Sequence, residues 1–107
     1  MRTKKEKDIV LKPKVLAETG LLLAADGKQL IAGADYKFRA LPFGEVAEWS
    51  GTVTTMSELP MDVEYVLSLE QEEDDRSGRI RLESMKITQK GKITACEYTF
   101  KGVSPLT

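Results

Sequence analysis

Short segments in which apolar and polar residues alternate recur along this chain, and they constrain its fold more than any other feature. The clearest are residues 63–70 and 79–83, where every second residue is apolar. A period of two is typical of a β-strand with one buried face. Turn residues separate about six to eight such segments, and no helical period is sustained. The sequence therefore predicts an all-β, mainly antiparallel fold with at most one short helix.

The N-terminal half is expected to begin with a hairpin. Residues 15–25 and 29–32 flank Asp26-Gly27, and an Asp-Gly pair between apolar runs is a strong signal for a tight turn. A second turn is expected at residues 33–35, followed by an alternating strand over residues 36–40. A Thr-rich, β-branched strand is expected next, and it ends at Thr55.

Two changes of parity in the C-terminal half indicate a sheet that curls. The inward positions pass from Ile80 and Leu82 to Met85 and Ile87, which requires an extra residue near Ser84. A second irregularity is predicted near residues 94–95, because the inward positions of the last strand change in the same way, from Ile93 and Ala95 to Cys96, Tyr98 and Phe100. Such β-bulges bend strands and are common at the corners of barrels. We therefore expect a small β-barrel or strongly curled sheet rather than a flat sandwich.

Length and charge predict one domain with a distinct N-terminus. At 107 residues the chain matches a single domain, divided into a flexible basic arm over residues 1–7 and a β-domain over residues 8–107, with a short first strand at residues 8–11. Residues 1–14 carry six Lys and Arg against two acidic residues, a net charge of +4. Residues 15–107 carry ten basic and fifteen acidic residues, a net charge of −5. The first 14 residues thus carry a net charge opposite in sign to that of the rest of the chain.

Two further features predict a cytoplasmic protein with no membrane segment. The longest apolar run spans residues 21–25, far short of the roughly 20 residues that cross a bilayer. Cys96 is the single cysteine, which excludes an intramolecular disulfide and fits a reducing compartment.

The absence of histidine narrows the chemistry available to this protein. It excludes Ser-His-Asp and Cys-His catalysis and the zinc sites built on histidine. The glycines are scattered, so no phosphate-binding loop is present. The acidic run over residues 70–75 lacks the spacing of a calcium loop and is interpreted as a solvated hairpin tip. We expect no catalytic residue, no metal and no cofactor, and a non-enzymatic role is favoured over an enzyme.

Two groups of residues are candidates for binding. An apolar patch for a ligand or partner is predicted from the sole tryptophan and the soft or aromatic side chains near it in the sequence: Phe43, Trp49, Met56 and Met61. Contacts with nucleic acid are predicted from basic residues in the arm and on the outer sheet face: Arg2, Lys4, Lys5, Arg79, Arg81, Lys86 and Lys92. Arg76 is expected on the same outer face.

These features leave three classes of function open. The favoured hypothesis is an interaction module that offers its barrel mouth or an edge strand to a protein partner, or to another copy of itself. The first alternative is a barrel that binds a small molecule in its interior. The second is a nucleic-acid-binding barrel, which ranks lower because acidic residues interrupt the basic face and the sequence pI is about 5.5.

Overall fold

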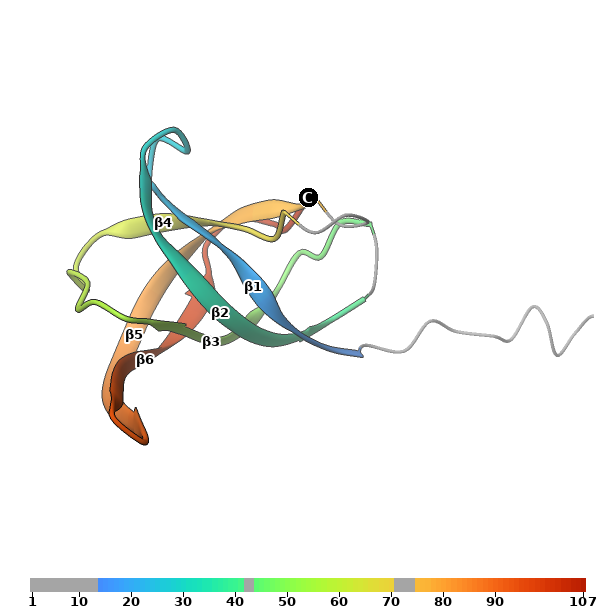
Figure 1. Cartoon of the computed structure of the whole chain (residues 1–107). Coiled ribbons are helices and arrows are strands. Elements are labelled where there is room, and N and C mark those ends of the chain that lie inside the picture. The colour runs from blue at the N-terminus through green and yellow to red at the C-terminus, as the bar shows by residue number, and fades with distance from the viewer. Residues whose placement is uncertain (1–13, 42–43, 71–74) are drawn as a thin grey trace, which may run out of the picture.

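The protein folds into six antiparallel β-strands, seen in a computed structural model that describes residues 14–41, 44–70 and 75–107, apart from the Lys90 side chain. No helix that could span a membrane occurs in these ranges. The strands, shown in Figure 1, are β1 (Lys14–Ala24), β2 (Leu30–Ala40), β3 (Ser50–Thr55), β4 (Glu64–Ser68), β5 (Ser77–Lys90) and β6 (Ile93–Gly102).

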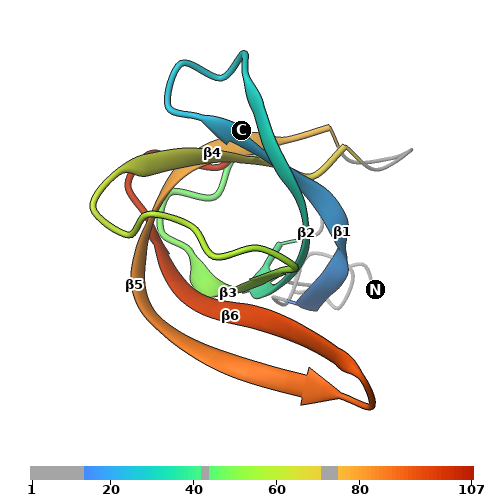
Figure 2. The same ribbon diagram turned by 60° about the vertical axis from the view of Figure 1, so that its left-hand side comes forward.

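The sheet closes into a barrel in the order β1-β2-β3-β6-β5-β4. Four of the six neighbouring pairs connect consecutive strands, and β3–β6 and β1–β4 complete the ring. The closing pair is short, because β4 meets β1 only over residues 21–24. Figure 2 shows the barrel and the long β5–β6 hairpin that extends beyond it, while the β1–β2 hairpin extends in another direction. The predicted all-β fold, with a barrel or strongly curled sheet, is confirmed.

Side chains fill the centre of the barrel. Alternate residues of each strand point inward, as the period of two predicts. A barrel with so few strands has an interior that side chains can fill completely. The largest fully buried side chains are Tyr98, Phe100, Leu22, Leu67, Leu69, Ile80, Leu106, Val53 and Thr55.

Two buried tyrosines hold the connection between β3 and β4 across one end of the barrel (Figure 2). The backbone N–H of Leu59 donates to the Tyr98 hydroxyl oxygen at 2.6 Å. The Tyr65 hydroxyl donates to the carbonyl oxygen of Pro60 at 2.7 Å. Both phenols thus fasten the loop while their rings remain in the core, which explains why tyrosine rather than phenylalanine occupies these positions.

These phenols predict a loss of stability at alkaline pH. Burial raises the pKa of both Tyr65 and Tyr98 above the ordinary value of 10.0. The folded state therefore holds the two protons more tightly than the unfolded state, so their contribution is complete below pH 10 and declines as pH rises above it. We expect urea midpoints to fall as the pH rises above about 10. A Tyr65→Phe/Tyr98→Phe variant should show a smaller fall than the native chain, and an unchanged fall would contradict the assignment.

Several local predictions are confirmed by the strand pairing. The β1–β2 hairpin turns at Asp26-Gly27, where Gly27 has a φ of 71°. The register of β5 and β6 shifts between Leu82 and Ser84, which is the predicted bulge. The Thr-rich strand is β3, and residues 45–49 lead into it without a helical turn.

The turn predicted at residues 33–35 is wrong, because β2 runs through it without a break. Ala34 pairs with Gly20 of β1, and a Cβ atom on Gly20 would lie 2.5 Å from the carbonyl oxygen of Ser68 and 3.1 Å from the Tyr36 ring. The small residues here allow an aromatic ring to pack closely on the neighbouring strand. They are a packing feature rather than a turn.

The second irregularity predicted at residues 94–95 is also wrong. Pairing between β5 and β6 continues without a shift from Ser84–Thr99 to Lys90–Ile93. The hairpin extends past the core at this point, so alternate residues have no core to face. Ile93 is consequently 55% exposed, and Ile87, predicted to point inward, is 67% exposed.

Arg76 does not lie on the outer face as predicted, because its side chain is buried. Its guanidinium donates to the carbonyl oxygens of Leu41 and Gly44 at 3.1 and 3.0 Å. A buried guanidinium needs such acceptors to offset its lost hydration. Arg76 thus connects the start of β5 to the segment that follows β2.

Candidate functional site

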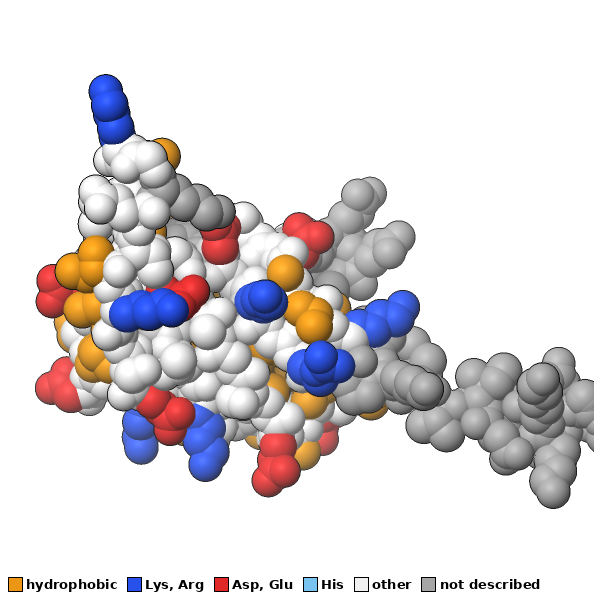
Figure 3. Space-filling model, turned by 90° about the horizontal axis from the view of Figure 1, so that it is seen from below, with side chains coloured by type: hydrophobic (Ala, Val, Ile, Leu, Met, Phe, Trp, Pro, Cys, Tyr) orange, Lys and Arg blue, Asp and Glu red, His pale blue; other side chains and the backbone are white. Residues whose placement is uncertain are grey.

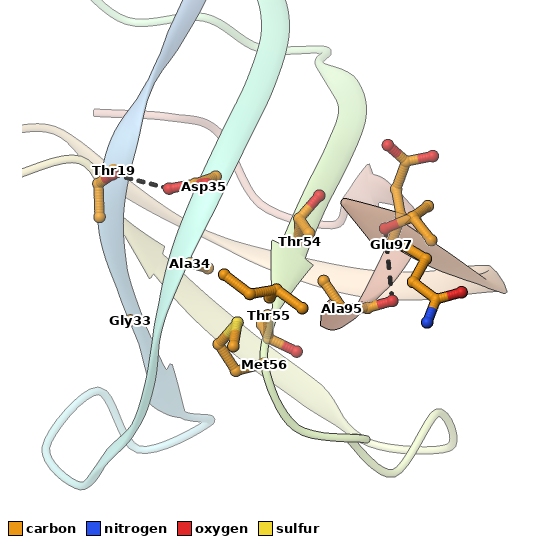
Figure 4. A pocket seen from close by; sticks show the side chains of 12 residues that line it. Thr19, Gly33, Ala34, Asp35, Thr54, Thr55, Met56, Ala95 and Glu97 are labelled. Carbon is orange, nitrogen blue, oxygen red and sulfur yellow. Dashed lines mark hydrogen bonds between the residues drawn. The ribbon is translucent and has the colours of Figure 1, made fainter. Parts of the chain in front are cut away.

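A pocket of about 570 Å³ lies beyond the C-terminal end of β3. The strand β3 ends at Thr55, whereas its two neighbours extend further at this end. Residues 30–34 of β2 and residues 93–95 of β6 have no counterpart in β3. We call this space, bounded by these two segments and the end of β3, the strand gap. Its lining, shown in Figure 4, comprises Thr19, Gly33, Ala34, Asp35, Thr54, Thr55, Met56, Thr88, Gln89, Ile93, Ala95 and Glu97.

Each side of the strand gap is a strand edge without a strand beside it among the described residues. Residues 30–34 pair with β1 on one edge, and residues 93–95 pair with β5 on one edge. Proteins usually protect such edges with lysine, proline or a bulge. Residues 30–34 read Leu-Ile-Ala-Gly-Ala and contain neither charge nor proline. Leu30 and Ile31 are 58% and 38% exposed. Ile31 is the extra residue of a bulge, because Leu22 pairs with Ala32 and Leu23 with Leu30. Residues 32–34 pair regularly with β1, so the regular part of this edge is open and uncharged.

A row of polar residues crosses the outer face at the strand gap. Pairing aligns Thr19, Asp35, Thr54, Glu97 and Lys86 across five strands. The Thr19 hydroxyl donates to Asp35 Oδ1 at 2.7 Å, and Lys86 Nζ lies 3.2 Å from Glu97 Oε1. Figure 4 shows the two carboxylates on either side of Thr54.

The lining of the strand gap carries a formal charge of −2. Asp35 and Glu97 contribute both charges, and none of the lining residues is Lys or Arg. Lys86, which is not a lining residue, forms an ion pair with Glu97, and solvent screens this pair because the Lys86 side chain is 72% exposed. The site thus combines apolar strand edges with negative charge, and it suits an extended apolar segment that carries a cation.

A larger hollow at the other end of β3 lacks these properties. It has a volume of about 650 Å³, and Trp49 lies at its side. Its charged lining consists of Arg39 and Lys101 with Glu48 and Glu83, so the charges balance. Both neighbours of β3 are paired with it here, through Phe38–Gly51 and Ser50–Lys101. The strand gap is therefore the stronger candidate site.

The predicted apolar patch is not assembled in one place. Trp49 and Met56 lie immediately before and after β3, at opposite ends of the strand. Trp49 is buried, Met61 is half-buried against the core, and Phe43 lies outside the described residues. Met56 is 69% exposed and lines the strand gap. One member of the predicted patch thus contributes to the candidate site.

The predicted basic residues are exposed where they are described. Arg79, Arg81 and Lys86 lie on β5 and Lys92 on the turn after it, whereas Arg2, Lys4 and Lys5 fall outside the described residues. Arg81 donates to Glu64 Oε2 at 2.9 Å, in addition to the Lys86–Glu97 pair. Figure 3 shows basic and acidic side chains interspersed on one face of the molecule.

Sequence reasoning missed the residues that define the strand gap, chiefly Asp35, Glu97, Ile31 and Ile93. Assigning residues 33–35 to a turn concealed the continuous edge of β2. The one available signal was the uncharged run at residues 30–34. Across the parts of the chain that the structure describes, no group of His, Cys, Asp and Glu is arranged to hold a metal ion.

Comparisons with protein families, with curated proteins and with solved structures found no match to this chain.

Proposed function

We propose that this protein is a non-enzymatic interaction module that binds an extended peptide segment of a protein partner in the strand gap. The observation that carries the proposal is the early end of β3, which leaves strand edges unpaired on both sides of a pocket. An inserted segment would continue β3 and pair with β2, with β6 or with both. Strand addition of this kind is a common way for β-domains to recognise peptides.

The surroundings of the strand gap define the peptide that it would select. Main-chain hydrogen bonds to the open edges supply affinity for any extended segment. Met56 and Ile93 line the strand gap, and Ile31 is exposed on the bordering segment of β2, so apolar side chains on the inserted segment are favoured. The carboxylates of Asp35 and Glu97 favour a Lys or Arg side chain where it passes the polar row. The expected ligand is an apolar β-former with at least one basic residue.

A displayed library of random heptapeptides tests the proposal directly. We expect the native protein to enrich extended apolar sequences that contain Lys or Arg. An Ile31→Lys/Ile93→Lys variant should bind the enriched peptides about tenfold more weakly or worse, because a lysine on each edge opposes strand addition and repels a basic ligand. Fluorescence anisotropy with labelled synthetic peptides gives the affinities.

The matched control places the same charges elsewhere. Val15 and Val103 have exposures of 47% and 42%, similar to those of the two isoleucines, and both lie at the opposite end of the barrel. A Val15→Lys/Val103→Lys variant should bind the enriched peptides as the native protein does. Failure to enrich any peptide whose binding depends on Ile31 and Ile93 would refute the proposal.

The other hypotheses receive less support. The strand gap has a volume in the range of small-molecule sites, but the barrel interior that such a carrier would use is filled with side chains. Nucleic-acid binding through the basic residues stays a prediction, with Arg81 and Lys86 each engaged by a glutamate. We also propose a cytoplasmic location, which the single cysteine supports.

A further inference from the structure

One segment of this chain matches the ligand that the strand gap would select. Residues 4–12 read Lys-Lys-Glu-Lys-Asp-Ile-Val-Leu-Lys, and they contain neither glycine nor proline. The run Ile9-Val10-Leu11 is apolar and mostly β-branched, which favours an extended strand. Lys12 follows the run directly, and Lys7 precedes it with Asp8 between them. The segment is thus an apolar β-former with several cations.

The charges of the two parts are complementary. Residues 1–14 carry a net charge of +4, whereas residues 15–107 carry −5. Two of the negative charges, Asp35 and Glu97, lie at the strand gap itself. The apolar run can pair with the uncharged edge of β2 while a flanking lysine approaches these carboxylates.

We propose that residues 4–12 of a second copy of this chain occupy the strand gap, so that the protein assembles with itself. This inference rests on the proposed function, because it requires the strand gap to accept an extended segment. The strand β1 begins at Lys14, which pairs with Ala40 at the end of the barrel opposite the strand gap. Proline at position 13 favours extended backbone at the residue before it. These features favour docking on a neighbouring copy over docking on the same chain.

Sedimentation velocity of the full chain over a range of concentrations tests this assembly. We expect the native protein to form dimers or larger species as its concentration rises. An Ile9→Asp/Leu11→Asp variant and the Ile31→Lys/Ile93→Lys variant should both sediment as monomers, while Val103→Lys should assemble like the native chain. Because opposite charges contribute, raising the ionic strength from about 0.05 to about 0.5 M should also weaken the assembly. Circular dichroism confirms that each variant keeps its β-structure.

A mixture of the two monomeric variants tests whether each variant has lost only one half of the interaction between segment 4–12 and the strand gap. The Ile9→Asp/Leu11→Asp variant keeps an intact strand gap, and the Ile31→Lys/Ile93→Lys variant keeps an intact segment 4–12. We therefore expect equal amounts of the two to form a 1:1 complex that neither forms alone. A mixture that stays monomeric would overturn the proposal.

The two proposals can fail separately. A native chain that is monomeric at every concentration would overturn the proposed assembly. This holds even if the segment docks on the strand gap of its own chain. If displayed peptides still bound in a manner that depends on Ile31 and Ile93, the proposed function would stand without this occupant. If no such peptide were enriched and no assembly formed, both proposals would fall.

Discussion

Replacing Trp49 with alanine is expected to lower the free energy of unfolding by about 3 to 5 kcal/mol. The indole is 5% exposed and lies 5.3 Å, centroid to centroid, from both Phe38 and Phe100. Its N–H donates to the carbonyl oxygen of Ser104 at 2.8 Å. The substitution therefore creates a cavity, removes two aromatic contacts and leaves one carbonyl without its donor.

The cavity left by Trp49 is expected to persist, because the residues around the indole belong to paired strands. Gly78 of β5 and Gly102 of β6 lie directly against the indole, and a Cβ atom on Gly78 would come within 2.6 Å of Trp49 Cζ2. Because these positions belong to paired strands, they cannot move inward independently. Urea unfolding followed by circular dichroism measures the loss. Met56→Ala, at the other end of β3 and 69% exposed, should change stability by less than about 0.5 kcal/mol. Similar losses for the two variants would contradict the prediction.

The substitution Gly51→Ala should destabilise the barrel by about 3 kcal/mol or more. Gly51 lies in β3 and pairs with Phe38 of β2 on one side and Phe100 of β6 on the other. A Cβ atom here would overlap the carbonyl oxygen of Lys37 and approach Phe38 Cα to 2.9 Å. Since these are backbone atoms, a rotamer change cannot relieve the collision, and β2 and β3 must move apart.

Gly33→Ala is the matched control for this prediction. Gly33 lies in β2, and the nearest atom to an added Cβ would be Gly20 O at 4.0 Å, an ordinary contact. An alanine here removes backbone freedom from the unfolded chain at little cost in the folded state. We expect the urea midpoint of Gly33→Ala to stay equal or rise, while that of Gly51→Ala falls. Equal effects of the two substitutions would show that the close approach at Gly51 does not limit stability.

Local patterns were sufficient to predict most of the fold. Alternation placed Tyr65, Leu67, Tyr98 and Phe100 in the core, and all four are buried. The parity change near Ser84 predicted a bulge, and a register shift occurs there. Side-chain alternation is a direct consequence of strand geometry, so it can be read without knowing which strands are neighbours.

Alternation was misleading where a strand extends beyond the core. Alternation predicted inward positions for the apolar residues Ile87 and Ile93, but the β5–β6 hairpin carries them past the packed interior. Val63 is 45% exposed for a different reason, because β4 begins one residue later. A residue pattern records the preference of a side chain, whereas the extent of the core depends on all six strands together.

The strand gap shows the same difference between what residue patterns predict and what the arrangement of strands decides. The alternating segments of this sequence, by themselves, determined an antiparallel barrel or curled sheet, because strand geometry imposes its period on neighbouring residues. Only the tertiary structure decided that β3 stops at Thr55 between two longer strands, and that Asp35 and Glu97 lie on either side of Thr54. Those relations join residues about 20 to 60 positions apart in the chain, and the sequence carries no local signal for them because they arise from strand order and register.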